Sequence, residues 1–194
     1  MKIAKLLMAV GCAFSLPAIA DPIYTANLSG ANESPANLSP GTGFATVIFN
    51  LVAHTMEVQV TFSGLTGTTT ASHIHCCTAA AGAGTAGVAT VTPTFTGFPS
   101  GVTAGTYDHL FDLTLASSWN SAFITGNGGT PGSAEAALLA GLASGKAYLN
   151  IHSSTFGGGE IRGFLAPVPE PGSMLLLGSV VAGIFLARRK RLIG

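Results

Sequence analysis

The sequence predicts an all-β domain, an antiparallel β-sandwich with one short helix, and three observations support this. Apolar and polar residues alternate in several segments, as they do in strands with one buried face. Gly- and Ser-rich segments, which favour turns, separate the alternating ones. Charged residues make up only 8% of the 194 residues, which disfavours a cytosolic helical protein.

The expected strands follow from these patterns in chain order. The first is a β-branched and aromatic run set off by two preceding glycines, and the others show period-two alternation or a short apolar run after glycines. They cover residues 45–51, 56–62, 111–115, 147–152 and 160–165.

One helix is expected between the last strands. Ser133 can act as its N-cap, Glu135 suits the positive end of the helix dipole, and Gly145 would end it. One stripe of this helix is apolar, formed by Ala134, Leu138 and Leu142.

Residues 1–20 have the pattern of a secretory signal peptide. Lys2 and Lys5 precede an apolar run over 6–16, and a small-x-small cleavage site ends at Ala20. The alternative is an N-terminal membrane anchor, but the apolar run is shorter than the roughly 20 residues of a membrane span. Cleavage would remove Cys12 and leave two cysteines in the mature chain.

The C-terminal segment, 167–194, has three parts in order. The triplet Pro169, Glu170 and Pro171 is followed by an apolar run over 174–187 and then by four basic residues. We expect the apolar run to form a transmembrane helix in the inner membrane, with the basic end in the cytoplasm.

This C-terminal segment resembles the PEP-CTERM sorting signal. The resemblance implies processing by an exosortase-type membrane protease in a Gram-negative bacterium that makes extracellular polysaccharide or biofilm. An ordinary C-terminal anchor is the alternative, and it gives the same topology. We therefore expect a periplasmic, cell-surface or extracellular-matrix protein that is anchored in the membrane before processing.

The charge of the middle of the chain argues against nucleic acid as a partner. Residues 21–168 carry seven acidic and two basic side chains, a net charge of −5. Binding of nucleic acid depends on Lys and Arg neutralising phosphates, so this class of partner is excluded.

Three histidines are candidate metal ligands. His73 and His75 project from one face of an expected strand, and His152 from another. If these strands are neighbours, three imidazoles could hold copper or zinc, with a carboxylate from Glu160 as a further ligand. The alternative is a structural layer in which the imidazoles hydrogen-bond to carbonyl groups or to Glu160.

Cys76 and Cys77 directly follow His75, and three states remain open for them. They could form a disulfide between neighbours in an oxidising compartment, stay as buried thiols, or serve as metal thiolates. No motif of a catalytic nucleophile, phosphate loop or zinc hydrolase is present. We therefore predict no enzymatic activity and no required cofactor.

Ordered motifs across residues 21–166 resemble the CHRD family, which is named after chordin. They include Leu28-x-Gly30-x-x-Glu33-x-Pro35, His73-Ile-His75, Tyr148-x-Asn150-Ile-His152 and Gly158-Gly-Glu160-Ile-Arg162-Gly163. The resemblance implies an immunoglobulin-like or superoxide-dismutase-like sandwich, and it does not imply dismutase activity. It also draws attention to a polar network of Asn150, Glu160 and Arg162, which could pair with the histidines.

The sequence thus predicts an exported, non-enzymatic surface or matrix protein that acts in adhesion or in assembly of exopolysaccharide or biofilm. Its partners would be an exosortase and extracellular polysaccharide or other surface proteins. The alternative prediction is a copper- or zinc-binding or redox module.

Overall fold

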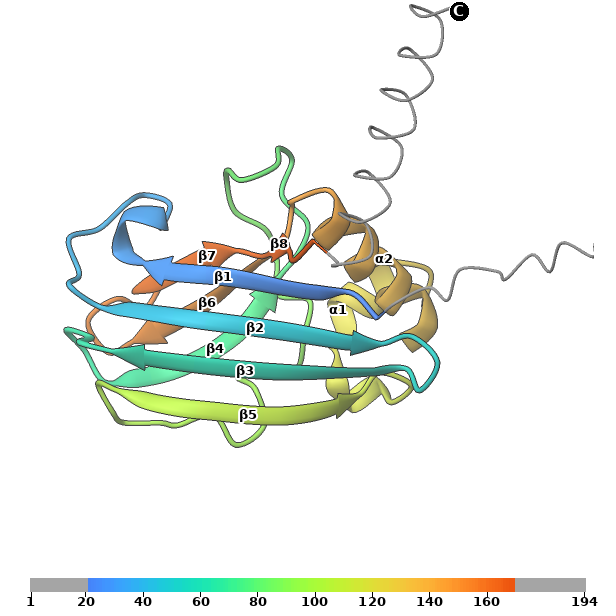
Figure 1. The fold of residues 1–194 in the computed structure, drawn as a ribbon, viewed down its shortest axis with the longest axis horizontal. Coiled ribbons are helices and arrows are strands. Elements are labelled where there is room, and N and C mark those ends of the chain that lie inside the picture. Colours follow the sequence, from blue (N-terminus) through green and yellow to red (C-terminus); the bar gives the residue numbers. More distant parts are fainter. Residues whose placement is uncertain (1–20, 170–194) are drawn as a thin grey trace, which may run out of the picture.

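The computed structural model describes residues 21–169, and its strands form one antiparallel sheet that curls on itself (Figure 1). The strands are β1 (Ile23–Ser29), β2 (Thr42–Asn50), β3 (Thr55–Ser63), β4 (Thr69–His75), β5 (Gly105–Asp112), β6 (Tyr148–Ser153), β7 (Ile161–Phe164) and β8 (Ala166–Pro167). The helices are α1 (Ser121–Gly126) and α2 (Pro131–Ala143), with short 3-10 turns at Gly30–Asn32 and Ala116–Ser118.

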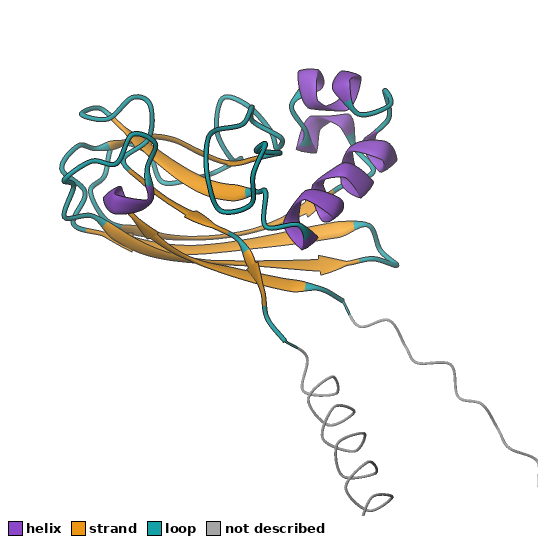
Figure 2. Ribbon diagram, turned by 90° about the horizontal axis from the view of Figure 1, so that it is seen from above, coloured by secondary structure: helices purple, strands orange, loops and turns teal. Residues whose placement is uncertain are grey.

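The strand order is β4-β6-β7-β1-β2-β3-β5, and β8 pairs with β1. Curling brings β4, β6 and β7 behind the layer formed by β1, β2, β3 and β5 (Figures 1 and 2). The alternation of apolar and polar residues along the strands explains which side chains form the core between these two groups of strands. In β3, for example, Met56, Val58 and Val60 are buried, whereas the residues between them are more exposed.

The prediction of an antiparallel β fold with little helix is confirmed, but the two-sheet sandwich is not what the described residues form. One continuous hydrogen-bonded sheet runs from β4 to β5. Its centre is the β7–β1 pairing, which joins Arg162 to Ser29. A pairing between the two ends of the domain closes what would otherwise be two sheets into a half-barrel.

The helical region differs from the sequence prediction at two points. Thr130, not Ser133, is the N-cap of α2, and the two side chains form a reciprocal capping box, with Pro131 at the first helical position. A second helix, α1, precedes it and was not predicted. Its N-cap is Asn120, whose side chain accepts a hydrogen bond from the Ala122 N–H.

The two terminal predictions lie mostly outside the described residues. The signal peptide over 1–20 and the apolar run over 174–187 are not described, and neither are Glu170 and Pro171. Within residues 21–169, no helix is long and apolar enough to cross a membrane.

Candidate metal centre

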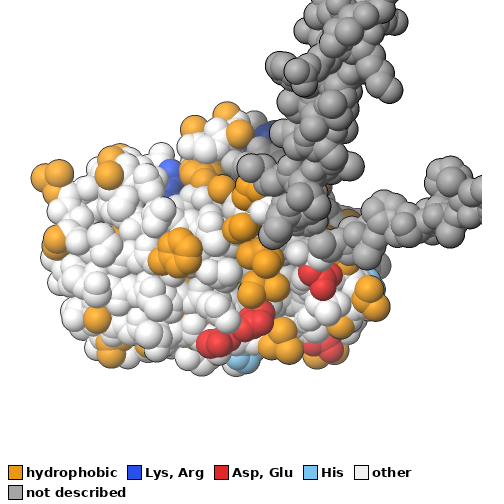
Figure 3. Space-filling model, in the orientation of Figure 1, with side chains coloured by type: hydrophobic (Ala, Val, Ile, Leu, Met, Phe, Trp, Pro, Cys, Tyr) orange, Lys and Arg blue, Asp and Glu red, His pale blue; other side chains and the backbone are white. Residues whose placement is uncertain are grey.

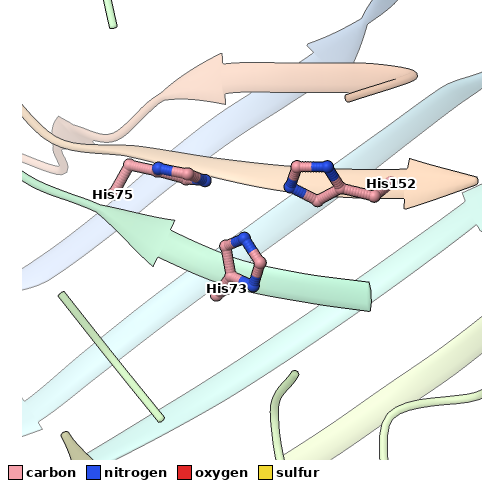
Figure 4. A group of neighbouring side chains, drawn as sticks. All are labelled: His73, His75 and His152. Atoms are coloured by element: carbon pink, nitrogen blue, oxygen red, sulfur yellow. The ribbon is translucent and has the colours of Figure 1, made fainter. Parts of the chain in front are cut away.

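The three candidate histidines lie together on the outer face of β4 and β6 (Figure 4). In the β4–β6 ladder, His73 is opposite Asn150 and His75 is opposite Tyr148. Side chains two residues apart in a strand share a face, so His152 joins Asn150 and Tyr148 on the same face of β6. Ile74 points the other way and is fully buried in the core.

The imidazole rings are in mutual contact. The ring centroid of His73 lies 4.7 Å from that of His75 and 4.7 Å from that of His152. One nitrogen from each ring can be chosen so that the three atoms all lie within 4.8 Å of one another. His73 and His75 are buried, with 7% and 9% of their surfaces exposed, and His152 is half-buried.

Backbone carbonyl groups hold two of the rings. His75 Nδ1 lies 2.8 Å from the oxygen of Ala86, and His152 Nδ1 lies 3.0 Å from the oxygen of Gly157. A carbonyl can only accept, so Nδ1 carries the proton in both rings and Nε2 keeps its lone pair. The nitrogens His73 Nδ1, His75 Nε2 and His152 Nε2 are buried and have no hydrogen-bond partner among the described residues.

Burial keeps these histidines neutral. Desolvation and, to a smaller extent, the neighbouring His75 and His152 lower the pKa of His73 to about 3. Desolvation also lowers the pKa of His75 to about 4, although the hydrogen bond to Ala86 acts in the opposite direction. The pKa of His152 is lowered as well, again by burial. Neutral imidazole is the form that ligates metals.

This arrangement fits a transition-metal ion. Imidazole nitrogens suit zinc and copper, and a tetrahedral zinc ion with Zn–N bonds of about 2.0 Å needs nitrogens roughly 3.3 Å apart. The candidate nitrogens lie within 4.8 Å of one another, so they would have to move closer together to hold such an ion. In such a site, the carbonyl groups of Ala86 and Gly157 would supply the outer hydrogen bonds that orient metal-binding imidazoles.

Tyr148 and Arg162 border the histidines on the side of β7. The Tyr148 ring stacks on His75, with centroids 4.7 Å apart and planes 6° apart, and the Arg162 guanidinium lies 4.6 Å from the Tyr148 ring centre. Arg162 also donates to the oxygens of Asn32 and Gly84. Its Nε lies 3.8 Å from Glu33 Oε2, so a buried carboxylate partly offsets its charge.

The predicted pairing of Glu160 with the histidines is wrong. The carboxylate of Glu160 instead accepts hydrogen bonds from the Ser39 hydroxyl at 2.6 Å, from the Gly67 N–H at 3.2 Å and from the Thr66 N–H. Of the predicted polar network, Asn150 and Arg162 face each other across the β6–β7 ladder, but Glu160 lies apart from them.

Cys76 and Cys77 are joined in a disulfide, and their sulfurs lie against α2 rather than against the histidines. A side chain on Gly141 would collide with both sulfur atoms. In this state the sulfurs are not thiolates and cannot serve as the predicted thiolate ligands.

Glu33 and Tyr148 belong to this site, although neither was predicted as a site residue from its own local pattern. Both stand in the motifs that resemble the CHRD family, and those motifs are the signal that could have found them. Glu33 is 129 positions from Arg162 in the chain, and the β1–β7 pairing brings its loop to the site.

Two family models match the chain. The CHRD domain family model matches residues 24–165, and the PEP-CTERM protein-sorting motif matches residues 167–191. No curated protein and no solved structure matches the chain. The sorting motif indicates an exported protein that is sorted by an exosortase. The chain therefore belongs to the CHRD domain family.

Proposed function

We propose that this domain binds one Zn²⁺ or Cu²⁺ ion through His73, His75 and His152. The observation that carries the proposal is the contact of three imidazoles, each of which has a buried nitrogen without a hydrogen-bond partner among the described residues. Buried polar groups in native proteins nearly always have a partner. An ion that accepts three lone pairs would satisfy all three nitrogens at once.

The chemistry of the site also favours these ions. Neutral imidazoles bind borderline ions such as Zn²⁺ and Cu²⁺ better than Mg²⁺ or Ca²⁺, which prefer oxygen ligands. The two fixed Nδ1–H groups prevent His75 and His152 from turning their lone pairs away from the centre. This local order favours binding over the purely structural layer of histidines.

The place of action that we propose is the periplasm or the outer surface of a Gram-negative bacterium. Before exosortase processing, residues 174–187 would hold the chain in the inner membrane. The domain would then act there as a non-enzymatic, metal-binding surface module.

Metal content measures the proposal directly. We expect the purified protein, equilibrated with Zn²⁺ or with Cu²⁺ and desalted, to keep one ion per chain. His75→Gln should lose at least 90% of that metal, while His109→Ala, on β5, keeps it. Equal metal in both variants would show that binding is adventitious, and metal-free wild-type protein would exclude the centre.

A second candidate function is adhesion to a neutral polysaccharide, favoured by the outer face of β1, β2, β3 and β5. Phe44 is 44% exposed there, and shallow grooves of about 650 and 570 Å³ lie beside it. Hydroxyl, amide and carboxylate side chains border the ring, namely those of Thr46, Gln59, Thr61, Thr106 and Asp108. Figure 3 shows this face, on which hydrophobic and charged side chains are scattered among polar side chains and backbone.

An exposed aromatic ring among neutral polar groups suits the apolar faces and hydroxyl groups of sugars. The acidic net charge of the domain would repel an acidic polymer. We expect Phe44→Ala to abolish retention on insoluble neutral glucan, whereas Val52→Ala, at a still more exposed apolar residue in a turn, leaves it unchanged. Retention that is the same for all three proteins would exclude this role for the Phe44 face.

A further inference from the structure

Five buried polar side-chain atoms of the described chain have no hydrogen-bond partner, and all five belong to one patch. Three are the histidine nitrogens of the proposed centre, and the other two are Asn150 Oδ1 and Glu33 Oε1. Asn150 lies opposite His73 in the β4–β6 ladder and opposite Arg162 in the β6–β7 ladder. Glu33 lies beside Arg162. The two oxygens thus border the histidines on the side of β7.

The two oxygens approach the same point of the backbone. An atom at the Cβ position of Gly159 would lie 2.5 Å from Asn150 Nδ2, 2.8 Å from Asn150 Oδ1 and 2.8 Å from Glu33 Oε1. Gly159 has φ +130, which only glycine readily adopts, so the chain passes close to both oxygens without a side chain. Asn150 and Glu33 are 3% and 9% exposed, so bulk water does not satisfy these acceptors freely.

All five atoms are hydrogen-bond acceptors when the imidazoles are neutral and Glu33 is ionised, which requires a pH above the raised pKa of Glu33, about 7. A metal ion can satisfy three nitrogens, but two oxygens at the edge of the site need hydrogen-bond donors. Three protein ligands leave at least one coordination position of zinc or copper unfilled by the protein. A ligand in that position could bind the ion with its lone pair and donate its hydrogens to the oxygens.

We propose, on the basis of the metal centre above, that the bound ion keeps an open coordination position facing Asn150 and Glu33 and takes a small neutral ligand that donates hydrogen bonds. Water, ammonia, primary amines and alcohols belong to this class. Anions without hydrogens, such as azide, lack the donors that the two oxygens require. The site therefore selects its exchangeable ligand by hydrogen-bond donation.

The test uses the full chain loaded with Co²⁺, whose visible bands report changes in coordination. Ammonia and azide are titrated separately into wild-type protein, into Asn150→Ala and into Asn27→Ala, a matched change at an exposed asparagine of β1. We expect ammonia to change the spectrum of the wild type. Asn150→Ala should weaken ammonia binding about 3- to 10-fold, the effect of one hydrogen bond, and leave azide binding unchanged or stronger. Asn27→Ala should match the wild type.

Each other outcome has one meaning. Protein that binds one Co²⁺ but shows no spectral change with ammonia has no open position, which overturns this inference and leaves the metal centre standing. Equal weakening of ammonia and azide binding in Asn150→Ala would show that Asn150 only shapes the site, and it would overturn the selection by donors. Protein that binds none of the three ions Co²⁺, Zn²⁺ and Cu²⁺ would contradict the proposed function itself. The wild-type titration needs no substitution and remains decisive if a variant misfolds.

Discussion

At the scale of single residues, Glu33 should make stability depend on pH. Burial raises its pKa from 4.5 to about 7, while the charge of Arg162 acts in the opposite direction. Between these two pH values the folded protein keeps a proton that the unfolded chain has released. Stability from this group is therefore present at low pH and is lost as pH rises from about 4.5 to 7.

We expect Glu33→Gln to remove this dependence. The free energy of unfolding of the variant minus that of the wild type should be about 1–3 kcal/mol larger at pH 8 than at pH 4. Urea unfolding with a chelator present measures this, and Glu57→Gln on β3 is the control for loss of one acidic side chain. A gain that is the same at both pH values would contradict the assignment.

The histidines should have the opposite effect in the metal-free protein. Burial lowers the pKa of His73 to about 3 and that of His75 to about 4, both below the 6.5 of an unfolded chain. Their contribution is present above pH 6.5 and is lost as pH falls toward 4, because the unfolded chain takes up protons first. From pH 7 to pH 5, the wild type should lose about 2–4 kcal/mol more than the double variant His73→Gln/His75→Gln. Chemical denaturation at both pH values would show it, and equal losses would refute it.

Sequence analysis identified the three histidines but not the correct carboxylate beside them. Two-residue spacing within strands was enough to place His73 with His75, because alternation holds inside a strand. The same rule failed for Glu160 because β7 begins only at Ile161. Glu160 lies in the turn before β7, where backbone N–H groups bind its carboxylate.

At the scale of elements, α2 offers a test of how closely the disulfide packs. A side chain on Gly141 would collide with the sulfurs of Cys76 and Cys77, whereas one on Gly132, in the first turn of the same helix, would meet nothing within 4 Å. Gly141→Ala should destabilise the protein by about 1–3 kcal/mol through overpacking. Gly132→Ala should be neutral or stabilise it by up to about 1 kcal/mol, since alanine favours helix. Thermal unfolding distinguishes these results, and equal stability of the two variants would mean that α2 does not press on the disulfide.

The elements with a strong apolar period were predicted well, and those without one were not. The runs 45–51, 56–62 and 147–152 became β2, β3 and β6 within a few residues. The run 111–115 was misplaced because β5 ends at Asp112, and Leu113 is buried beyond it in a turn. Six-residue α1 is too short for a helical period to show, and a side-chain cap and tertiary contacts define it instead.

At the scale of the whole molecule, the curled sheet depends on contacts that no local pattern shows. β1 pairs with β2 along the chain, but it also pairs with β7 from the far end of the domain. This closure places the loop carrying Glu33 next to Arg162 and so assembles the acceptor side of the site. The histidines needed only the β4–β6 pairing, which explains why the sequence suggested them and not the rest.

The most direct test of the metal centre is X-ray absorption fine structure of the zinc-loaded protein. We predict about three imidazole nitrogens at a Zn–N distance near 2.0 Å, one further light atom and no sulfur, because the sulfurs of Cys76 and Cys77 are paired. A sulfur shell near 2.3 Å, or an oxygen-only shell without imidazole scattering, would contradict a centre built from His73, His75 and His152.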